Sequence, residues 1–159
     1  MSLDLCILAS GSAGNCSVVR SPRGLLLIDG GLGQRSIDAR LRAAGCRGVR
    51  ADDLAGVLLT HLDRDHLSTH FLAWAARRRL PIFCHAAKVQ ELLATARRWA
   101  ADAPVPNVFG FGDDPFEPVD GITVDPVPLA HDAEGSHAFI LGARERAPGS
   151  AARRIGFAT

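Results

Sequence analysis

The chain of 159 residues contains no tyrosine, and aromatic residues make up only 6% of it. This scarcity weakens the expectation of a base-stacking surface of the kind that single-strand nucleic-acid binders use. No apolar run approaches the ~18 residues that a membrane-spanning helix requires. The first residues carry neither a basic stretch nor an apolar core long enough for export. We therefore expect a cytoplasmic protein with no membrane partner.

An excess of charge of one sign is also missing. Lys and Arg number 18 and Asp and Glu number 17, which gives a formal net charge of +1. No whole-molecule field therefore directs the protein to nucleic acid or to a membrane surface. The four cysteines form no Cys-x-x-Cys pair. We expect them to be reduced thiols.

Short apolar runs alternate with segments of helical periodicity over the first two thirds of the chain. The expected strands are residues 3–9, 16–20, 25–28, 57–59 and 81–84, and the expected helices are residues 37–44, 67–79 and 86–101. After Pro104 the pattern predicts mostly strand, at residues 108–111, 122–129, 138–141 and 155–158. Such alternation predicts an α/β architecture of helices packed on a sheet, and the length predicts one domain over residues 1–159.

Four potential metal ligands follow the apolar run 57–59 within six positions. They are His61, Asp63, Asp65 and His66. Charged groups and imidazoles are costly to gather at the end of a buried strand unless a cation is present. Imidazole with carboxylate suits Zn²⁺, and also Mn²⁺ or Fe²⁺. A bound dication lowers the pKa of its water to about 7, so the cluster predicts hydrolytic chemistry.

A simpler interpretation makes this segment a charged loop. Asp65 would then cap the following helix, and His61 and His66 would be polar surface residues. This explains Asp65 and leaves the other three residues unexplained. We therefore favour the metal site.

Residues 60–66, Thr-His-Leu-Asp-Arg-Asp-His, resemble the His-x-His-x-Asp-His signature of the metallo-β-lactamase superfamily. Residues 26–31, Leu-Leu-Ile-Asp-Gly-Gly, are similar to that superfamily's other early motif. The Gly- and Ser-rich residues 9–15 are similar to its WalJ/YycJ-like branch, which is related to RNase Z. The resemblance implies a metallo-β-lactamase-like αββα sandwich, present as its first half plus the start of the second.

The resemblance also implies a set of site residues. It assigns a first metal to His61, Asp63 and His131, and a second to Asp65 and His66. Asp65 is also the candidate catalytic residue. Asp29 would hold the ligand loop in place by hydrogen bonds. Zn²⁺ is the expected ion, with Mn²⁺ or Fe²⁺ as alternatives.

Two departures from the family pattern stand out. Asp63 occupies a position where the common motif has His. The strand at residues 155–158 resembles the one that precedes a bridging Asp in the family, and here the sequence ends at Thr159. We expect the family's second half, with a further His ligand, to be missing. We also expect either a homodimer or a longer natural chain.

The predicted function is a metal-dependent hydrolase that uses metal-bound hydroxide. By resemblance to the WalJ/YycJ-like branch, its substrates would be the phosphodiester bonds of nucleic acid, which would make it a zinc nuclease. The alternative is an incomplete or catalytically inactive module that binds metal and serves in assembly. A further alternative is a thioester or lactone hydrolase on the same fold.

Three histidines besides His131 lie outside the motif, and so does Cys16. His85 ends an expected strand and is a spare ligand candidate, whereas we expect His70 to be a polar flank of its helix and His137 to be structural. Cys16 has no local base to activate it as a nucleophile. Gly31 and Gly33 follow a strand, yet position 36 is Ser where a dinucleotide-binding loop requires Gly or Ala.

Overall fold

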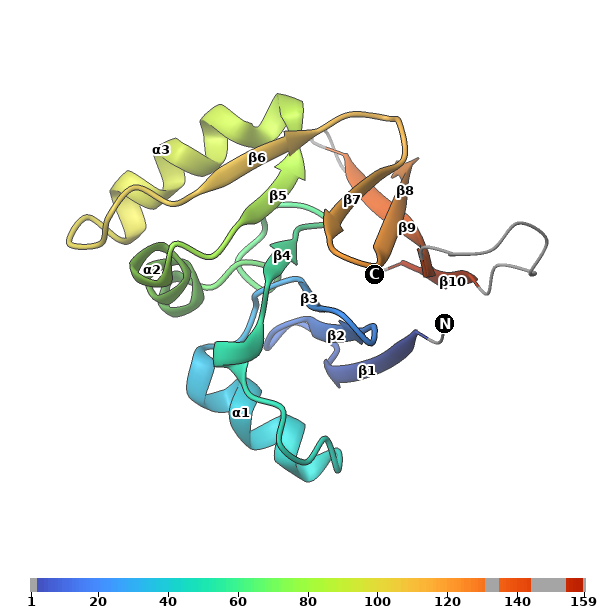
Figure 1. Cartoon of the computed structure of the whole chain (residues 1–159). Helices are drawn as coiled ribbons and strands as arrows, with labels where there is room; N and C mark the ends of the chain where they lie inside the picture. The colour runs from blue at the N-terminus through green and yellow to red at the C-terminus, as the bar shows by residue number, and fades with distance from the viewer. Residues whose placement is uncertain (1–2, 131–134, 144–153, 159) are drawn as a thin grey trace.

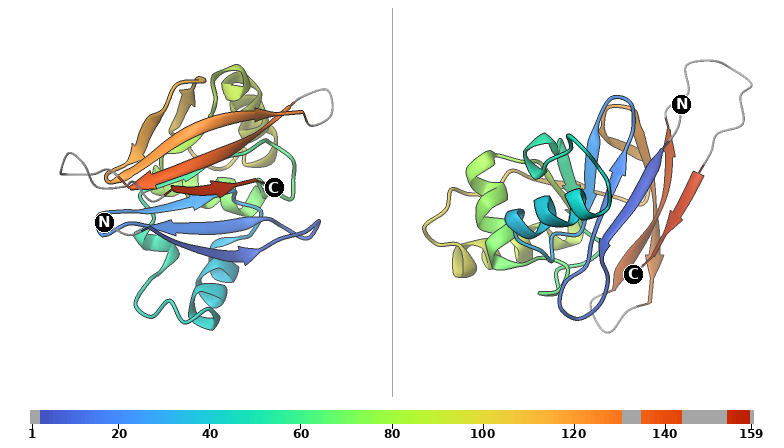
Figure 2. Two further views of the ribbon diagram at one scale, coloured as in Figure 1. Left: turned by 90° about the vertical axis from the view of Figure 1, so that its right-hand side faces the viewer. Right: turned by 90° about the horizontal axis from the view of Figure 1, so that it is seen from below.

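The computed structural model describes residues 3–130, 135–143 and 154–158. Two β-sheets lie face to face in this part of the chain, and helices cover the outer face of the larger sheet (Figures 1 and 2). The order of layers is helix, sheet, sheet. This is the expected arrangement of the first half of the αββα sandwich with the beginning of the second half.

The larger sheet has six strands in sequence order. They are β1 (Asp4–Ala9), β2 (Cys16–Arg20), β3 (Leu25–Ile28), β4 (Gly56–Leu58), β5 (Ile82–His85) and β6 (Val108–Phe111). The first three pair antiparallel, and β3 to β6 pair parallel. Parallel strands end at the same edge of a sheet, so the residues that follow β3, β4, β5 and β6 meet there.

The smaller sheet has four antiparallel strands. In spatial order they are β10 (Arg154–Phe157), β9 (Ser136–Ala143), β8 (Ile122–Leu129) and β7 (Phe116–Val119). The sequence pattern did not predict β7. Pro115 precedes this strand and Pro118 lies within it, and proline disfavours a strand. Edge strands tolerate proline, and β7 is an edge strand of this sheet.

Three α-helices connect the strands of the larger sheet: α1 (Gln34–Ala43), α2 (Thr69–Arg78) and α3 (Val89–Trp99). Two short 3₁₀ helices are formed by Ala51–Asp53 and Ala86–Lys88. The helix expected from residue 67 begins two residues later. Ser68 is its N-cap, with Oγ accepting the N–H of Phe71 at 3.2 Å, and Leu67 instead forms a β-bridge with Gly30.

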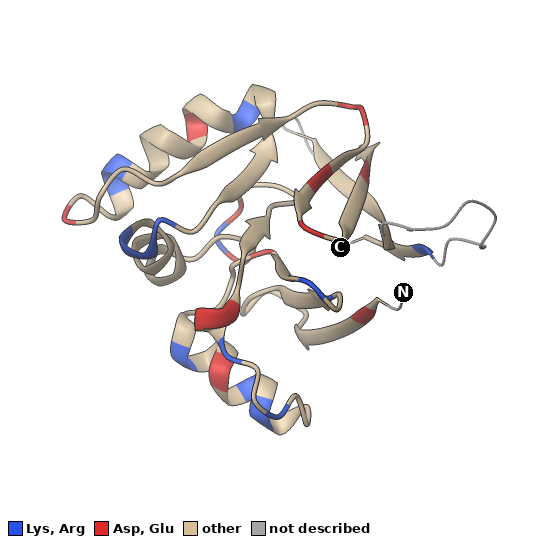
Figure 3. Cartoon of the chain, viewed as in Figure 1, with Lys and Arg blue, Asp and Glu red and all other residues tan. Residues whose placement is uncertain are grey.

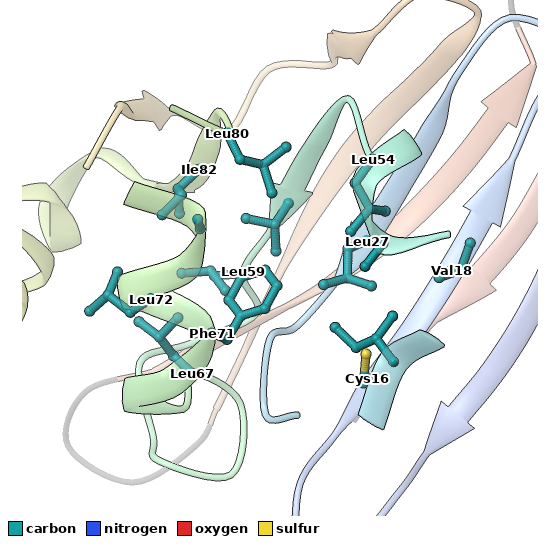
Figure 4. Close-up of a cluster of buried hydrophobic side chains, with 14 of the residues drawn as sticks. Cys16, Val18, Leu27, Leu54, Leu59, Leu67, Phe71, Leu72, Leu80 and Ile82 are labelled. Atoms are coloured by element: carbon teal, nitrogen blue, oxygen red, sulfur yellow. The ribbon is translucent and has the colours of Figure 1, made fainter. Parts of the chain in front are cut away.

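Two apolar cores lie on the two faces of the larger sheet. Val57 and Leu59 belong to the core beneath the helices, and Leu58 belongs to the core between the sheets. All three are almost completely buried, which is why residues 57–59 are continuously apolar, as expected of a strand covered on both faces. Figure 4 shows the first core, in which Phe71 and Leu72 of α2 lie over strand residues such as Leu27.

The surface carries both signs of charge. The positions of acidic and basic residues are interspersed along the helices and the smaller sheet, as the coloured ribbon of Figure 3 shows. Arg77, Arg78 and Arg79 are exposed at the end of α2, where cations suit the helix dipole. Among the described helices, none has the length and apolar content to cross a bilayer.

Candidate metal centre

The site begins at Asp29, the residue that follows β3. Asp29 is completely buried and has φ of 60°, a left-handed conformation that is uncommon for residues other than Gly. Its N–H donates to the carbonyl of Leu58 on the neighbouring strand at 3.0 Å. Backbone strain of this kind is often found at functional sites. Here the unusual turn directs the carboxylate toward the loop that follows β4.

The carboxylate of Asp29 organises that loop through Thr60 and His66. The Thr60 N–H donates to Oδ1 of Asp29 at 2.9 Å, and the Thr60 hydroxyl lies 3.0 Å from each carboxylate oxygen. His66 Nδ1 lies 2.8 Å from Oδ2 of Asp29. Thr60 Oγ1 also lies 2.9 Å from Nδ1 of His61. One buried acid therefore fixes both ends of residues 60–66.

Because the Nδ1 atoms of both histidines face this network, their Nε2 atoms face the two acidic residues of the motif. His61 Nε2 lies 3.4 Å from Oδ2 of Asp63, and His66 Nε2 lies 3.5 Å from Oδ2 of Asp65. The two imidazole rings lie 3.9 Å apart between centroids. The four residues thus form two adjacent imidazole–carboxylate pairs, His61 with Asp63 and His66 with Asp65.

These separations fit a tetrahedral cation. With metal–ligand bonds of ~2.0–2.1 Å, two ligands of a tetrahedral Zn²⁺ lie about 3.4 Å apart. A neutral imidazole nitrogen and a carboxylate oxygen both offer lone pairs, so they repel each other unless a proton or a cation lies between them. The donor set therefore suits a divalent metal at each pair, although the role of these residues as ligands remains a prediction.

Asn15 contacts the site, and the sequence pattern did not identify it as a site residue. Its amide donates to Oδ2 of Asp65 at 3.0 Å and lies 2.9 Å from Nε2 of His66. Its backbone N–H donates to the carbonyl of Asp65 at 2.6 Å. Asn15 therefore holds the second pair from the side opposite to Asp29. The sequence feature that could have indicated this role is an Asn placed directly after a Gly-rich turn.

Gly31 allows these loops to approach closely. A side chain at Gly31 would collide with the carbonyl of Asp65, and its Cβ would lie 2.6 Å from the backbone nitrogen of Asn15. The Asp29-Gly30-Gly31 segment thus supplies the buried acid and the space for the loop that it holds. Arg64, within the motif, is anchored over the ring of Trp99 on α3 at 5.1 Å from the ring centroid.

The predicted residues differ in burial. His61, His66 and Asp29 are buried, whereas the side chain of Asp63 is 51% exposed and that of Asp65 is 33% exposed. The alternative role of Asp65 as a helix cap is wrong, because Ser68 caps α2. His131, the predicted third ligand of the first metal, lies outside the described residues.

The pKa of His66 reflects competing effects. Burial lowers it, but the hydrogen bond and the charge of Asp29, together with the charges of Asp65 and Asp63, outweigh burial and raise the pKa above its usual value. The network therefore places strong negative potential at the His66 ring. The same potential favours a bound cation.

The other histidines lie in two different environments. His70 is exposed on α2. His85 and His137 stack on each other with ring centroids 4.7 Å apart, near Asp113. The expectation that His137 is merely structural did not anticipate this contact. Burial and the neighbouring His85 lower the pKa of His137, with Asp113 acting in the opposite direction, which favours a neutral ring.

Comparison with known proteins assigns the family. A family model described as the metallo-beta-lactamase superfamily matches residues 9–145. The chain belongs to this superfamily. The match confirms the resemblance carried by residues 26–31 and 60–66, both of which lie inside the matched region.

Individual relatives show how much of the superfamily fold is present. Exodeoxyribonuclease YycJ of Bacillus anthracis is 28% identical over 134 residues, which are 84% of this chain and 47% of that protein. A B3 metallo-beta-lactamase with an active-site glutamic acid has a TM-score of 0.66 and 19% identity, over 96% of this chain and 58% of that chain. Zn²⁺-bound PqqB from Methylobacterium extorquens has a TM-score of 0.55 and 18% identity, over 81% and 49%. The chain therefore spans about half the length of these relatives, and the two solved structures are similar to it in fold.

Proposed function

We propose that the chain provides a divalent-metal site for hydrolysis of the phosphodiester bonds of nucleic acid, with Zn²⁺ as the expected ion and Mn²⁺ or Fe²⁺ as alternatives. The observation that carries the proposal is the pairing of two imidazole Nε2 atoms with two carboxylates at 3.4 and 3.5 Å. Zinc is favoured because PqqB, a solved structure of similar fold, is described as Zn²⁺-bound.

The residues divide into ligands and residues that position them. His61 and Asp63 would hold one ion, with His131 as the expected third ligand, and Asp65 and His66 would hold the other. A cation bound there lowers the pKa of a coordinated water toward 7 and neutralises charge on a phosphate. Asp65, which pairs with His66, is the candidate catalytic residue.

Thr60 and Asp29 keep the two imidazoles in the orientation that ligation requires. A metal-binding imidazole usually donates its other ring N–H to a carboxylate, carbonyl or hydroxyl group, which fixes the tautomer. His66 has such a partner in Asp29 at 2.8 Å, and His61 has one in Thr60 at 2.9 Å. Both rings therefore direct Nε2 toward the carboxylates of the motif.

Two observations support nucleic acid as the proposed substrate class: the name of one relative and a groove that begins at Gly31. Exodeoxyribonuclease YycJ is a curated relative of the chain. A hollow of about 480 Å³ begins at Gly31, beside Asp65, and is lined among others by Arg35, His70 and Trp74. A guanidinium suits phosphate and an indole suits a stacked base. This groove would take a single strand that leads to the metal loop.

The metal part is tested by metal content. Protein purified without chelator is expected to carry metal, and Asp65→Asn is expected to lose the equivalent held by Asp65 and His66. His70→Gln is the matched control, because His70 is exposed on α2 and has no role in the motif. Less than about a tenth of an equivalent of metal per chain in the parent protein would refute the site, since a real site is substantially occupied.

The hydrolytic part is tested by turnover. The metal-loaded protein is expected to cleave bis(p-nitrophenyl) phosphate and end-labelled single-stranded DNA, and Asp65→Asn is expected to abolish both activities. Trp74→Ala should weaken cleavage of DNA and leave the small phosphodiester unaffected. Full metal occupancy without turnover would instead support the metal-binding module, and cleavage of a thioester alone would support the third alternative.

A further inference from the structure

A second group of metal-ligand side chains lies outside the motif, at the place where the two sheets meet. His85 is the last residue of β5, Asp113 lies in the turn between β6 and β7, and His137 is the second residue of β9. One donor atom from each lies within 4.8 Å of the other two. Within residues 3–130, 135–143 and 154–158, this is the one group of three His, Cys, Asp or Glu residues that meets this condition.

We infer that His85, Asp113 and His137 bind a divalent transition-metal ion that joins the two sheets. Two imidazoles with one carboxylate form a donor set typical of Zn²⁺, with water as the fourth ligand. The inference concerns a different site from residues 60–66 and does not depend on the proposed hydrolase activity.

The two rings are held in place by an apolar neighbour. The His85 and His137 rings are nearly parallel, with an interplanar angle of 21°. Each meets the ring of Phe111 edge-on, at centroid distances of 5.8 and 5.5 Å. Phe111 is buried in the core between the sheets. The site therefore has a rigid, apolar back and two imidazoles whose positions are set by packing.

The third donor can move to meet an ion. Asp113 Oδ1 lies 3.9 Å from Nε2 of His85, and the Asp113 side chain is 82% exposed. Two ligands of a tetrahedral Zn²⁺ are about 3.4 Å apart, so Asp113 must approach by roughly 0.5 Å. An exposed side chain in a turn can do so at little cost. The described residues form no hydrogen bond to either imidazole ring, and the carboxylate of Asp113 is the acidic group beside them.

The inferred site is connected to the ligand loop. The His137 N–H donates to the carbonyl of Thr60 at 3.2 Å, and Ser136 Oγ lies 3.3 Å from Nδ1 of His61. His61, His85 and His137 line the same cavity of about 340 Å³. An ion at the inferred site would thus fix the start of β9 against Thr60 and His61. Its expected role is to stabilise the wall of this cavity.

The test uses variants that separate the two metal sites. In Asp63→Asn/Asp65→Asn, which changes the two more exposed residues of the motif, titration with Co²⁺ should still show about one equivalent bound per chain, with visible d–d absorption. Adding His137→Gln should remove that equivalent. His70→Gln serves as the control for replacing a histidine elsewhere on the surface.

A second set of measurements distinguishes loss of the metal site from unfolding of the variants. Asp113→Asn should fold as the parent does, because Asp113 is mostly exposed, and should weaken binding of Zn²⁺ at this site by at least about tenfold. Zn²⁺ should raise the Tm of Asp63→Asn/Asp65→Asn by several degrees, and this rise should disappear in His85→Gln/His137→Gln added to that background.

The inference is overturned if the folded Asp63→Asn/Asp65→Asn variant binds no Co²⁺, or if its binding is unchanged by His137→Gln and by Asp113→Asn. The result is independent of the proposed hydrolase. If residues 61–66 bind no metal or support no activity while the equivalent at His85, Asp113 and His137 is still bound, the proposed function fails and the inferred site stands. The reverse result would remove only the inferred site.

Discussion

Nδ1 of His66 lies 2.8 Å from Oδ2 of Asp29, although 37 positions separate the two residues in the sequence. An ionised carboxylate can only accept hydrogen bonds, so Nδ1 must carry the proton that it donates. In the neutral ring the lone pair is then on Nε2, which faces Asp65. One buried carboxylate therefore determines which nitrogen of His66 is available to a metal.

Replacing Asp29 should destabilise the fold and disturb the ligand loop. Asp29→Ala leaves the Thr60 N–H and the His66 N–H without their buried acceptor, and we expect a loss of roughly 3 kcal/mol in the free energy of unfolding. Asp29→Asn keeps the size, tolerates the positive φ and can still accept from Thr60, so its loss should be about half as large. Chemical denaturation of metal-free protein measures both. Equal stability of the Ala variant and the parent would contradict the importance of this network.

Gly31→Ala should lower both stability and metal content, although it adds only one methyl group. The added methyl group would collide with the carbonyl of Asp65 and crowd the backbone of Asn15, and overpacking of this kind costs roughly 1–3 kcal/mol. Because the displaced segment carries Asp65, metal occupancy should fall together with the denaturation midpoint. Gly112→Ala is the matched control, since a Cβ there has no neighbour within 4 Å, and it should change stability by less than about 0.5 kcal/mol. A wild-type metal content in Gly31→Ala would show that the contact of Gly31 with Asp65 and Asn15 can accommodate a methyl group without displacing Asp65.

Part of the site could be predicted because it depends on local rules. Runs such as 25–28 and 57–59 predict buried neighbouring strands, and parallel strands bring Asp29 and His61 to one edge of the sheet. The ligand pairing within residues 60–66 follows from a loop held at both ends. These features need only the strand order and the short spacing of the motif.

Other features depend on packing between distant segments, which no short pattern encodes. Asn15 reaches Asp65 only because Gly31 lets their backbones pass closely. His85 and His137 meet only because the second sheet lies over the first, and Asp113 joins them through the turn before β7, a strand that its prolines concealed. Contacts across layers are set by the angle and distance between sheets, and the sequence pattern indicates only which faces are apolar.

The four thiols should differ in reactivity. Burial, with a smaller effect from the charge of Asp29, raises the pKa of the Cys16 thiol to about 12, and burial together with Glu91 raises that of Cys84 to about 12. At pH 8 such thiols are ionised in on the order of one molecule in ten thousand, and only the thiolate reacts rapidly. Iodoacetamide should therefore label Cys46, which is partly exposed, well before Cys16 and Cys84. Mass spectrometry before and after denaturation measures the order, and rapid labelling of Cys16 in the folded protein would contradict it.

Asp63 should influence which metal the first pair prefers. Its carboxylate adds a hard, negatively charged ligand beside His61, whereas the common motif has an imidazole there, and imidazole favours Zn²⁺ over Mn²⁺ more strongly than carboxylate does. Asp63→His is therefore expected to raise the ratio of Zn²⁺ to Mn²⁺ bound from an equimolar mixture, by several-fold. Asp63→Ala should weaken binding of either ion at that pair. Because the Asp63 side chain is 51% exposed, neither change should alter the stability of the metal-free protein by more than about 0.5 kcal/mol. If the metal ratio of Asp63→His and the metal content of Asp63→Ala both equal those of the parent, Asp63 is not a ligand, and the first ion would depend on His61 and residues beyond the motif.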